Sequence, residues 1–213
     1  MHACMDSARI VERLGPFLEN DVLSAEQLSL ISAHLELLRK WNAYVNLTSV
    51  RSDEAIVSRH FGESLFSARK LKPLIPSEAS LVDFGSGAGF PGIPIKIWIS
   101  GLRVVLIESR QKKATFLNEV IRTLGIEGIA VSNRRAEEFE TQADVVTLRA
   151  VEKFEQILPI AERLVRPGGR LVLLIGSQQA FVASSLLPQF TWQESHEIPL
   201  SSSRIVLIGQ APH

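Results

Sequence analysis

The glycine-rich segment from Gly85 to Gly92 is the part of the sequence best suited to bind a ligand. It directly follows the short apolar run Leu81–Phe84. Glycines in such a loop permit a tight turn and let the backbone come close to a ligand. A helix that begins after the loop, at Pro91 or Pro94, would point its free N–H groups at that ligand. The segment therefore predicts a site for a nucleotide-type cofactor with an anionic group.

The spacing of these glycines distinguishes between two classes of nucleotide-type cofactor. The dinucleotide fingerprint has Gly at positions one, three and six, and the third of these positions is Phe90 here. Glycines instead alternate at Gly85, Gly87 and Gly89, which is the spacing usual at S-adenosylmethionine sites. Asp83, two residues upstream, stands where such sites hold the cofactor's methionine ammonium through an acidic group or its waters. The loop therefore predicts S-adenosylmethionine, with a glycine-rich turn that binds no ligand as the alternative.

Glu108 is the next residue suited to a nucleotide-type ligand. It follows the apolar run Arg103–Ile107, at the distance of roughly 20 residues where nucleotide-binding folds place such an acid. A carboxylate at the end of the second strand can accept hydrogen bonds from both hydroxyls of a ribose. Both classes of cofactor carry a ribose, so Glu108 supports an adenosine ligand without choosing between them. Taken alone, it would be a solvated strand end.

Strands and helices alternate along the chain after residue 80 and place these residues at one edge of a sheet. Alternating β and α units predict parallel strands joined by right-handed crossovers. The last two apolar runs have no helix between them, so they predict an antiparallel hairpin. The expected strands are 81–84, 103–107, 129–131, 144–148, 171–175, 191–198 and 205–209, with helices at 112–124, 154–165 and 178–187. This order predicts the α/β fold of class I methyltransferases, a doubly wound, seven-stranded, Rossmann-like sheet that is mostly parallel with a C-terminal antiparallel hairpin.

The segment before residue 80 has a helical pattern instead. Apolar residues recur every three or four positions over 25–41, as in an amphipathic helix, and Ser24 with Gln27 predicts a capping box at its start. Two further helices are expected at 8–18 and 53–70, the second capped by Asp53. We therefore expect an N-terminal helical extension over 1–76, packed on a methyltransferase core over 77–213.

Size and composition are those of a soluble globular protein. The chain has 213 residues, of which 46% are hydrophobic and 22% are charged, close to the globular average. No apolar run is long enough to span a membrane, and the start of the chain lacks a secretory signal pattern. Cys4 is the single cysteine, which excludes a disulfide within the chain and fits a reducing, cytoplasmic location.

Several short motifs between residues 41 and 176 carry a family resemblance. They are Trp41-Asn42 with Asn46-Leu47-Thr48, the run Arg59-His60-Phe61-Gly62-Glu63-Ser64-Leu65, Ile107-Glu108-Ser109, Lys112-Lys113, Phe116-Leu117, Arg135-Ala136-Glu137 and Leu148-Arg149-Ala150. Together with the phrase GFPGIP in the glycine loop, they resemble the bacterial small-subunit ribosomal RNA guanine-N7 methyltransferases, also called glucose-inhibited division protein B. The resemblance implies methyl transfer from S-adenosylmethionine, which leaves S-adenosylhomocysteine, to N7 of a guanine in 16S ribosomal RNA.

The resemblance also implies which residues meet the cofactor. At the matching motif positions these are Gly85, Phe90, Ala136, Glu137 and Arg149, with Glu108 holding the ribose, alongside the already expected Asp83, Gly87 and Gly89. Two positions depart from the family pattern. Glu63 stands where the family usually has Asp, and Ile175 stands before Gly176 where the family usually has Lys. If that lysine touches RNA, the determinants of substrate binding differ in this chain.

The implied reaction requires no catalytic side chain and no metal. Guanine N7 carries a free lone pair and no proton at neutral pH, so no general base is needed. The protein must place N7, methyl and sulfur in line, an effect that can contribute roughly 7–11 kcal/mol. Other methyl acceptors fit less well, because the loop at Leu148-Arg149-Ala150 lacks the (N/D)PP(Y/F) motif of amine methylation and Cys4 lies far from the core motifs.

Local basic residues, and not the net charge, are expected to contact RNA. The formal net charge is zero, which argues against binding through bulk charge alone, but phosphate contacts need only a few well-placed Lys or Arg. The candidates are Asn46, Arg59, His60, Lys112, Lys113 and Arg135. Several of them fall in loops at the carboxyl edge of the predicted strands. Each residue alone is more often a solvated or packing residue.

Three other functions remain open from the sequence. The same fold can methylate a small molecule or a protein, which the neutral net charge mildly favours. A nicotinamide-dependent oxidoreductase is disfavoured by Phe90. A binding protein without activity is disfavoured by the intact cofactor loop. The sequence leaves open which guanine is modified and whether the partner is naked RNA, the small ribosomal subunit or an assembly intermediate. The sequence shows no large apolar patch, so a monomer is expected.

Overall fold

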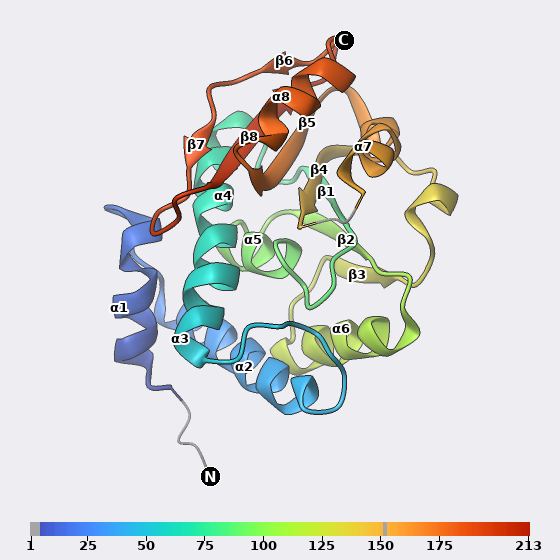
Figure 1. The fold of residues 1–213 in the computed structure, drawn as a ribbon. Coiled ribbons are helices and arrows are strands. Elements are labelled where there is room, and N and C mark those ends of the chain that lie inside the picture. Colours follow the sequence, from blue (N-terminus) through green and yellow to red (C-terminus); the bar gives the residue numbers. More distant parts are fainter. Residues whose placement is uncertain (1–4, 151–152) are drawn as a thin grey trace.

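One sheet organises the molecule in the computed structural model, which describes residues 5–150 and 153–213 (Figure 1). Its strands are β1 Ser80–Phe84, β2 Arg103–Ile107, β3 Ile129–Ser132, β4 Ala143–Arg149, β5 Val165–Gly176, β6 Thr191–Trp192, β7 His196–Glu197 and β8 Arg204–Gln210. They lie in the order β3-β2-β1-β4-β5-β8-β6, with β7 also paired to β8. Cys4, on which the predicted redox compartment rests, lies outside the described residues.

The pairing of the strands confirms the predicted fold. Strands β1 to β5 pair in parallel, and β8 pairs antiparallel to β5 on one side and to β6 and β7 on the other. Taken together, β6 and β7 are the single strand expected over 191–198, interrupted in the middle. Trp192 pairs with Gly209 and His196 with Val206, so one strand has an extra residue there, which is a β-bulge.

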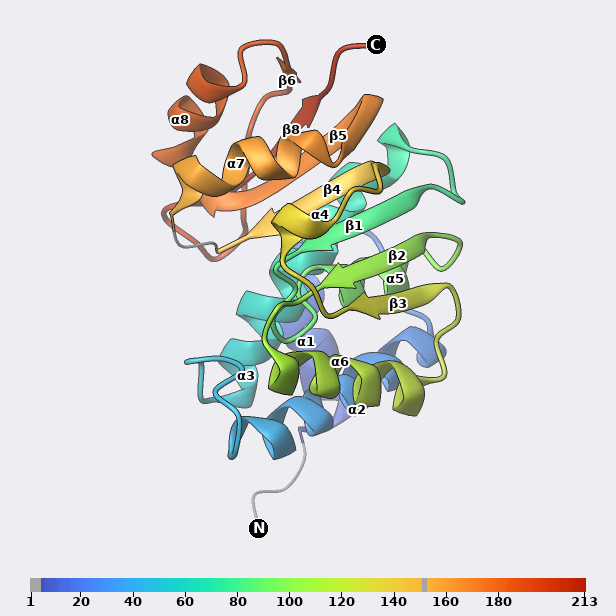
Figure 2. The ribbon, with the colours of Figure 1, turned by 90° about the vertical axis from the view of Figure 1, so that its right-hand side faces the viewer.

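Two hydrophobic clusters cover the two faces of the sheet. Alternate residues of a strand point to opposite faces, and Leu81 accordingly belongs to one cluster and Val82 to the other. The first cluster joins the sheet to the N-terminal helices and to α5 Gly92–Trp98 and α6 Gln111–Leu124. The second joins it to α7 Phe154–Arg163 and α8 Gln179–Leu186, which Figures 1 and 2 show on the other side of the sheet.

The N-terminal helices are α1 Ser7–Leu18, α2 Ala25–Asn42, α3 Asp53–Ile56 and α4 Glu63–Leu71. The predicted capping box of α2 is present, because Gln27 N donates to Ser24 Oγ and Ser24 N donates to Gln27 Oε1. These helices share their hydrophobic cluster with the sheet, and the boundary between residues 76 and 77 stays a prediction. None of the described helices is both long and apolar enough to cross a membrane.

The helix expected over 53–70 is confirmed, with a π-helical turn inside it, but its predicted cap is wrong. Ser52, and not Asp53, caps it, because Ser52 Oγ accepts a hydrogen bond from Ala55 N at 3.2 Å. A π-helical turn, η1 Val57–Gly62, separates α3 from α4. Such turns hold one extra residue per turn and occur often at functional sites. Here the turn carries Arg59 and His60.

The C-terminal half of the sheet also differs in detail from the expectation. Strand β5 begins six residues before the expected 171–175, and the segment Pro167-Gly168-Gly169 forms a bulge inside it, where the pairing shifts from Ala143–Val165 to Val145–Arg170. Gly168 has a φ of 70° there, which glycine adopts without strain. Beyond the bulge β5 runs as predicted.

Candidate functional site

The glycine loop joins β1 to α5 in a conformation that only glycines adopt freely. Gly85, Gly87 and Gly89 have φ values of 68°, 60° and 90°, all in the left-handed region that disfavours other residues. A side chain at Gly85 would meet no atom within 4 Å, because this residue borders an open cleft. Each glycine of the alternating pattern therefore stands at a position where the backbone conformation favours glycine over other residues.

Asp83 holds the glycine loop from beneath. Its side chain is fully buried, and Oδ2 accepts hydrogen bonds from Ser86 Oγ at 2.5 Å and from Gly92 N at 3.1 Å. Oδ1 accepts a hydrogen bond from Thr147 Oγ1 at 2.7 Å. Burial raises the pKa of this carboxyl, while the hydrogen bonds from Ser86 and Thr147 oppose the shift. The structure thus gives Asp83 a role in shaping the loop, and its contact with a cofactor ammonium stays a prediction.

Glu108 links the end of β2 to the same loop. Its Oε2 accepts a hydrogen bond from Gly87 N at 3.0 Å, and its Oε1 accepts one from Arg110 N at 2.8 Å. Asn133 Nδ2 donates to the Glu108 carbonyl oxygen at 2.8 Å, which ties this strand end to the segment after β3. A carboxylate fixed by two backbone N–H groups at the rim of a cleft is well placed to accept further hydroxyl donors.

One cleft at the carboxyl edge of the parallel strands brings together four of the predicted cofactor residues. Its volume is about 490 Å³, within the range of small-molecule sites. The lining includes Gly85, Glu108, Ala136 and Glu137, together with Phe84, Ile107, Ser109, Arg110, Arg134, Arg135, Ala150 and Ile157. The predicted contacts Asp83, Gly87, Gly89, Phe90 and Arg149 do not line it.

A larger cleft, of about 690 Å³, lies at the opposite edge of the sheet. Arg103, at the start of β2, and Gly128, just before β3, belong to its lining, and none of the predicted cofactor residues does. Ligands of doubly wound sheets bind outside the carboxyl ends of the strands. The smaller cleft is therefore the candidate site.

The side chain of Phe90 anchors the glycine loop to the N-terminal helices. Its ring stacks between His34 and His60, with ring centroids 5.0 Å apart in both pairs, and meets Phe61 edge-on at 4.9 Å. His34 is fully buried, and its Nε2 lies 3.0 Å from the Ala88 carbonyl oxygen. Any cofactor contact of Phe90 would therefore involve its backbone. The sequence prediction missed His34, although its place on the apolar face of α2 indicated burial.

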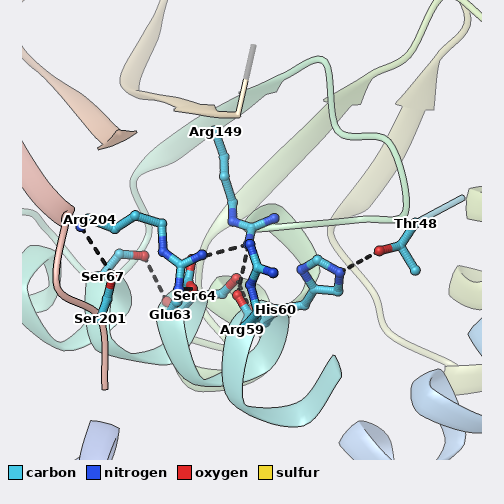
Figure 3. A network of polar contacts seen from close by, with 9 residues as sticks. All are labelled: Thr48, Arg59, His60, Glu63, Ser64, Ser67, Arg149, Ser201 and Arg204. Carbon is cyan, nitrogen blue, oxygen red and sulfur yellow. Dashed lines mark hydrogen bonds and ion pairs between the residues drawn. The ribbon is translucent and has the colours of Figure 1, made fainter. Parts of the chain in front are cut away.

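His60 lies at the meeting point of the π-helical turn, the glycine loop and the loop after α2. Its Nε2 is 2.7 Å from Thr48 Oγ1, a contact drawn in Figure 3. Its Nδ1 is buried without a hydrogen-bond partner. Burial lowers the pKa of His60 to about 3, with the cations Arg149 and Arg59 adding to the effect. The imidazole is therefore neutral at physiological pH.

Three arginines gather around the single carboxylate of Glu63 (Figure 3). Glu63 is 2% exposed; its Oε2 lies 3.1 Å from Arg149 Nη2 and its Oε1 lies 2.7 Å from Arg204 Nη2. Arg149 Nη2 also donates to the Arg59 carbonyl oxygen at 2.7 Å. Within the described ranges, Arg59 itself has no acidic partner and is exposed. The cluster therefore carries more positive than negative charge.

Arg204 is the functional candidate that the sequence prediction missed entirely. It stands opposite Gly176 in the pairing of β5 with β8. Ile175, where the family usually has Lys, is buried in the second hydrophobic cluster. A cation from β8 thus reaches this edge of the sheet although the expected position on β5 is apolar.

The other predicted RNA-contacting residues lie on separate elements of the same edge. Arg135 is exposed and lines the cleft. Lys112 is exposed and Lys113 half-buried in the first turn of α6. Asn46 is exposed in the loop after α2. The structure brings Arg59 and His60 together with Arg149, and Arg135 together with Glu108, but no contact links these two groups to Lys112, Lys113 or Asn46 within the described residues.

The cleft fits an adenosine-containing cofactor. At Gly85 the missing side chain leaves open space beside the cleft. Glu108 offers a fixed carboxylate to ribose hydroxyls, and the short helix η3 Ala136–Glu138 borders the cleft after β3. S-adenosylmethionine has a ribose, an adenine and an amino-acid end that match these three features.

Comparison with known proteins agrees with this geometry. Residues 27–197 match the family described as GidB, rRNA small subunit methyltransferase G. Proteins named Ribosomal RNA small subunit methyltransferase G are similar to the chain: that of Exiguobacterium sp. is 37% identical over 80% of this chain and 72% of its own length. The protein of Roseiflexus sp. is 41% identical over 76% of this chain and 70% of its own.

The fold has relatives among solved structures as well. The structure of P. horikoshii TYW2 in complex with MeSAdo covers 72% of this chain and 63% of that chain, with a TM-score of 0.60 and 15% identity. At that identity the likeness concerns the fold alone. Motifs, fold and relatives together confirm the predicted family: the chain is an S-adenosylmethionine-dependent methyltransferase that belongs to the family of rRNA small subunit methyltransferase G.

Proposed function

We propose that this chain transfers the methyl group of S-adenosylmethionine to N7 of a guanine in 16S ribosomal RNA of the small ribosomal subunit. The observation that carries the proposal is the cleft at the carboxyl edge, where Gly85, Glu108 and Ala136 converge beside exposed arginines. Relatives named for small-subunit ribosomal RNA support an RNA substrate. The specific atom, N7, rests on the motifs of the family.

Different residues of the cleft contact different parts of the cofactor in this proposal. The backbone of Gly85 borders the amino-acid end, the Glu108 carboxylate accepts the ribose hydroxyls, and Ala136 with Glu137 lies against the adenine. Gly87 supports this arrangement from outside the lining, because its N–H donates to Glu108 Oε2. Asp83 and Phe90 support the glycine loop from the side away from the cofactor. Asp83 holds the loop through three hydrogen bonds, and Phe90 anchors it by stacking between two histidines. The remaining predicted contacts, Gly89 and Arg149, do not line the cleft and stay proposals.

The reaction itself requires placement and not proton transfer. When bound, S-adenosylmethionine supplies an activated methyl group on a positively charged sulfur. Guanine N7 attacks with a lone pair that carries no proton at neutral pH, so no general base is needed. His60, a predicted RNA contact that could in principle act as a base, has its pKa lowered to about 3 and is held by Thr48 and Phe90. His60 therefore acts as a neutral, fixed packing group and not as a base. The protein contributes mainly by orienting the guanine.

The RNA side of the proposal rests on local charge. Arg149 and Arg204 share one carboxylate, and the exposed Arg59 is tied to Arg149, so the cluster offers net positive charge to an approaching phosphate. Arg135 at the cleft and Lys112 at the start of α6 extend the basic edge. Lys113, His60 and Asn46 complete the set of proposed RNA contacts. Such contacts make binding depend on salt.

We further propose that the chain acts as a monomer in the cytoplasm, on RNA or an assembling subunit and without a membrane partner. The sequence shows no large apolar patch that would mark an interface between copies of the chain, which supports a monomer. Light scattering during size-exclusion chromatography tests the oligomeric state.

The proposal is tested by methyl transfer from labelled S-adenosylmethionine to unmethylated bacterial small-subunit RNA, offered naked and as assembled subunits. Nucleoside mass spectrometry of the product should show 7-methylguanosine at one site. The better of the two substrates identifies the stage of assembly. If neither RNA is labelled while the protein binds S-adenosylmethionine, the methyl acceptor is a different molecule, and small-molecule and protein substrates would be tried next.

A further inference from the structure

The loop between α2 and α3, residues 43–52, is held in one shape by its own polar contacts. The side chain of Asn42 donates from Nδ2 to the Thr48 carbonyl oxygen at 3.1 Å. Its Oδ1 accepts hydrogen bonds from Leu47 N at 2.9 Å and Thr48 N at 3.0 Å. Leu47 is buried in the core and Val45 packs against it. The loop is therefore a rigid projection from the surface.

This rigid loop displays an aromatic side chain to solvent. Tyr44 is 87% exposed, the highest exposure among the large hydrophobic side chains of the described residues. In that part of the chain its phenol ring makes no hydrogen bond, ion pair or ring contact. Most tyrosines bury at least one face of the ring, because the apolar area gains free energy when it leaves water. An exposed ring on an ordered loop is available for stacking with a partner that arrives from outside.

The loop lies beside the proposed reaction site. Thr48, at its far side, contacts His60, and His60 stacks on Phe90 of the glycine loop. Trp41, just before the loop, packs on Phe116 of α6 with ring centroids 5.8 Å apart. In Figure 2 the arrowheads of the parallel strands β1 to β4 point to the left, and the loop between α2 and α3 lies on that side, at the carboxyl edge of the sheet.

Basic and polar residues lie on the same loop as Tyr44 and at the start of the neighbouring helix α6. Arg51 and Asn46, in the same loop, are exposed, and Lys112 lies one helical turn before Phe116, the residue that touches Trp41. Proteins that recognise unpaired nucleotides combine an exposed aromatic ring, on which a base stacks, with cations that meet the backbone. Aromatic and basic residues together on one edge fit this combination.

We propose that Tyr44 is a stacking platform for one unpaired base of the substrate RNA, next to the base that enters the site. The inference rests on the proposed function, because it assumes an RNA substrate at this edge. Since every base has a π-face, the platform contributes affinity without reading sequence. Asn46, two residues along the rigid loop, is placed to contact the same nucleotide through its amide.

Substitution of Tyr44 tests the proposal in the methyl-transfer assay. Tyr44→Ala should raise KM for RNA by roughly 5- to 150-fold, the effect of losing one base–aromatic stack. The value of kcat and the affinity for S-adenosylmethionine should not change. Tyr44→Phe should stay close to the wild type, because stacking does not need the hydroxyl group. Val22→Ala, at another exposed apolar residue, is the matched control and should have no effect.

A chemical probe gives a second readout that needs no turnover. Tyr44 is the only tyrosine of the chain, so nitration by tetranitromethane, followed as nitrotyrosine absorbance, reports this residue alone. Naked small-subunit RNA should slow nitration at least several-fold, while heparin, an anion without bases, should not. Equal protection by heparin would overturn the stacking role.

The two proposals fail in different ways. If the wild-type chain labels no RNA, the proposed function fails. If it labels RNA and Tyr44→Ala has an unchanged KM, only the stacking inference fails. A Tyr44→Ala defect on assembled subunits with none on naked RNA that is itself a substrate would also overturn the inference, because it would assign the ring to a protein partner.

Discussion

The charge cluster around Glu63 yields a prediction whose size follows from its burial. Replacing Glu63 by Gln keeps the shape of the side chain and removes the charge that Arg149 and Arg204 share. Breaking a buried ion pair by removing one partner costs about 3–5 kcal/mol, because the remaining charge stays desolvated. Glu63 is 2% exposed, but the side chain of Arg204 is 29% exposed, so solvent screens part of the repulsion. We therefore expect a loss of about 3 kcal/mol in the free energy of unfolding.

Urea unfolding followed by tryptophan fluorescence measures this loss, and thermal unfolding should show a midpoint lower by roughly 6–12 °C for a chain of this size. The variant Glu63→Asp keeps the charge on a shorter side chain and should lose much less. The informative control is the double variant Glu63→Gln/Arg204→Met. It leaves one unpaired guanidinium where Glu63→Gln leaves two, so it should be more stable than Glu63→Gln alone.

Two results would refute this reasoning. One is a Glu63→Gln variant within about 0.5 kcal/mol of the wild type, the usual range of surface substitutions. The other is a double variant that loses the sum of the two single losses, since additivity is the behaviour of residues that do not interact.

Three further predictions concern the loop, the cleft and the histidines. Asp83→Asn removes one acceptor oxygen from a buried hydrogen-bond network, so the free energy of unfolding should fall by about 1–3 kcal/mol and S-adenosylmethionine binding, measured by calorimetry, should weaken; unchanged values for both would contradict the loop-holding role. Glu108→Gln should weaken that binding by roughly 10- to 150-fold, the loss of one hydrogen bond to a charged group, and an unchanged Kd would remove the residue from the site. His34 and His60 have pKa values lowered by burial to about 4 and about 3, so their stabilising effect is complete above pH 6.5 and is lost as the pH falls toward those values. Between pH 7 and 5 each histidine should lower the free energy of unfolding by about 2 kcal/mol, and a His34→Gln variant should show a shallower pH dependence than the wild type in urea titrations, where equal slopes would count against the assignment.

Much of the cofactor side was predictable because its signals are local in the sequence. The left-handed conformations of Gly85, Gly87 and Gly89 require glycine, so the requirement appears directly as a spacing. Glu108 was predictable because a strand end fixes where its side chain emerges. Each of these signals depends on a few neighbouring residues. The structure shows the expected tight turn at the three glycines and places Glu108 at the cleft, as the sequence indicated.

The substrate side was less predictable because its contacts join distant segments. Nothing near Arg204 in the sequence indicates that β8 enters the sheet beside β5 and brings this guanidinium to Glu63. The apolar periodicity of α2 indicated that His34 is buried, but not that its ring stacks on Phe90. The π-helical turn that carries His60 has no local sequence signal either, so the sequence predicted the helix but not the turn inside it.

The place of β8 in the sheet has a consequence for how the protein forms during synthesis. Strand β8 follows all other strands in chain order, yet it lies inside the sheet, between β5 and β6. A ribosome therefore releases the glycine loop, the cleft residues and Glu63 before the strand that supplies Arg204. Until that strand emerges, β5 is an unprotected sheet edge, which is prone to pair with other chains, and Glu63 has only Arg149 as its counter-ion. The charge cluster around Glu63 is thus completed only after β8 has been synthesised.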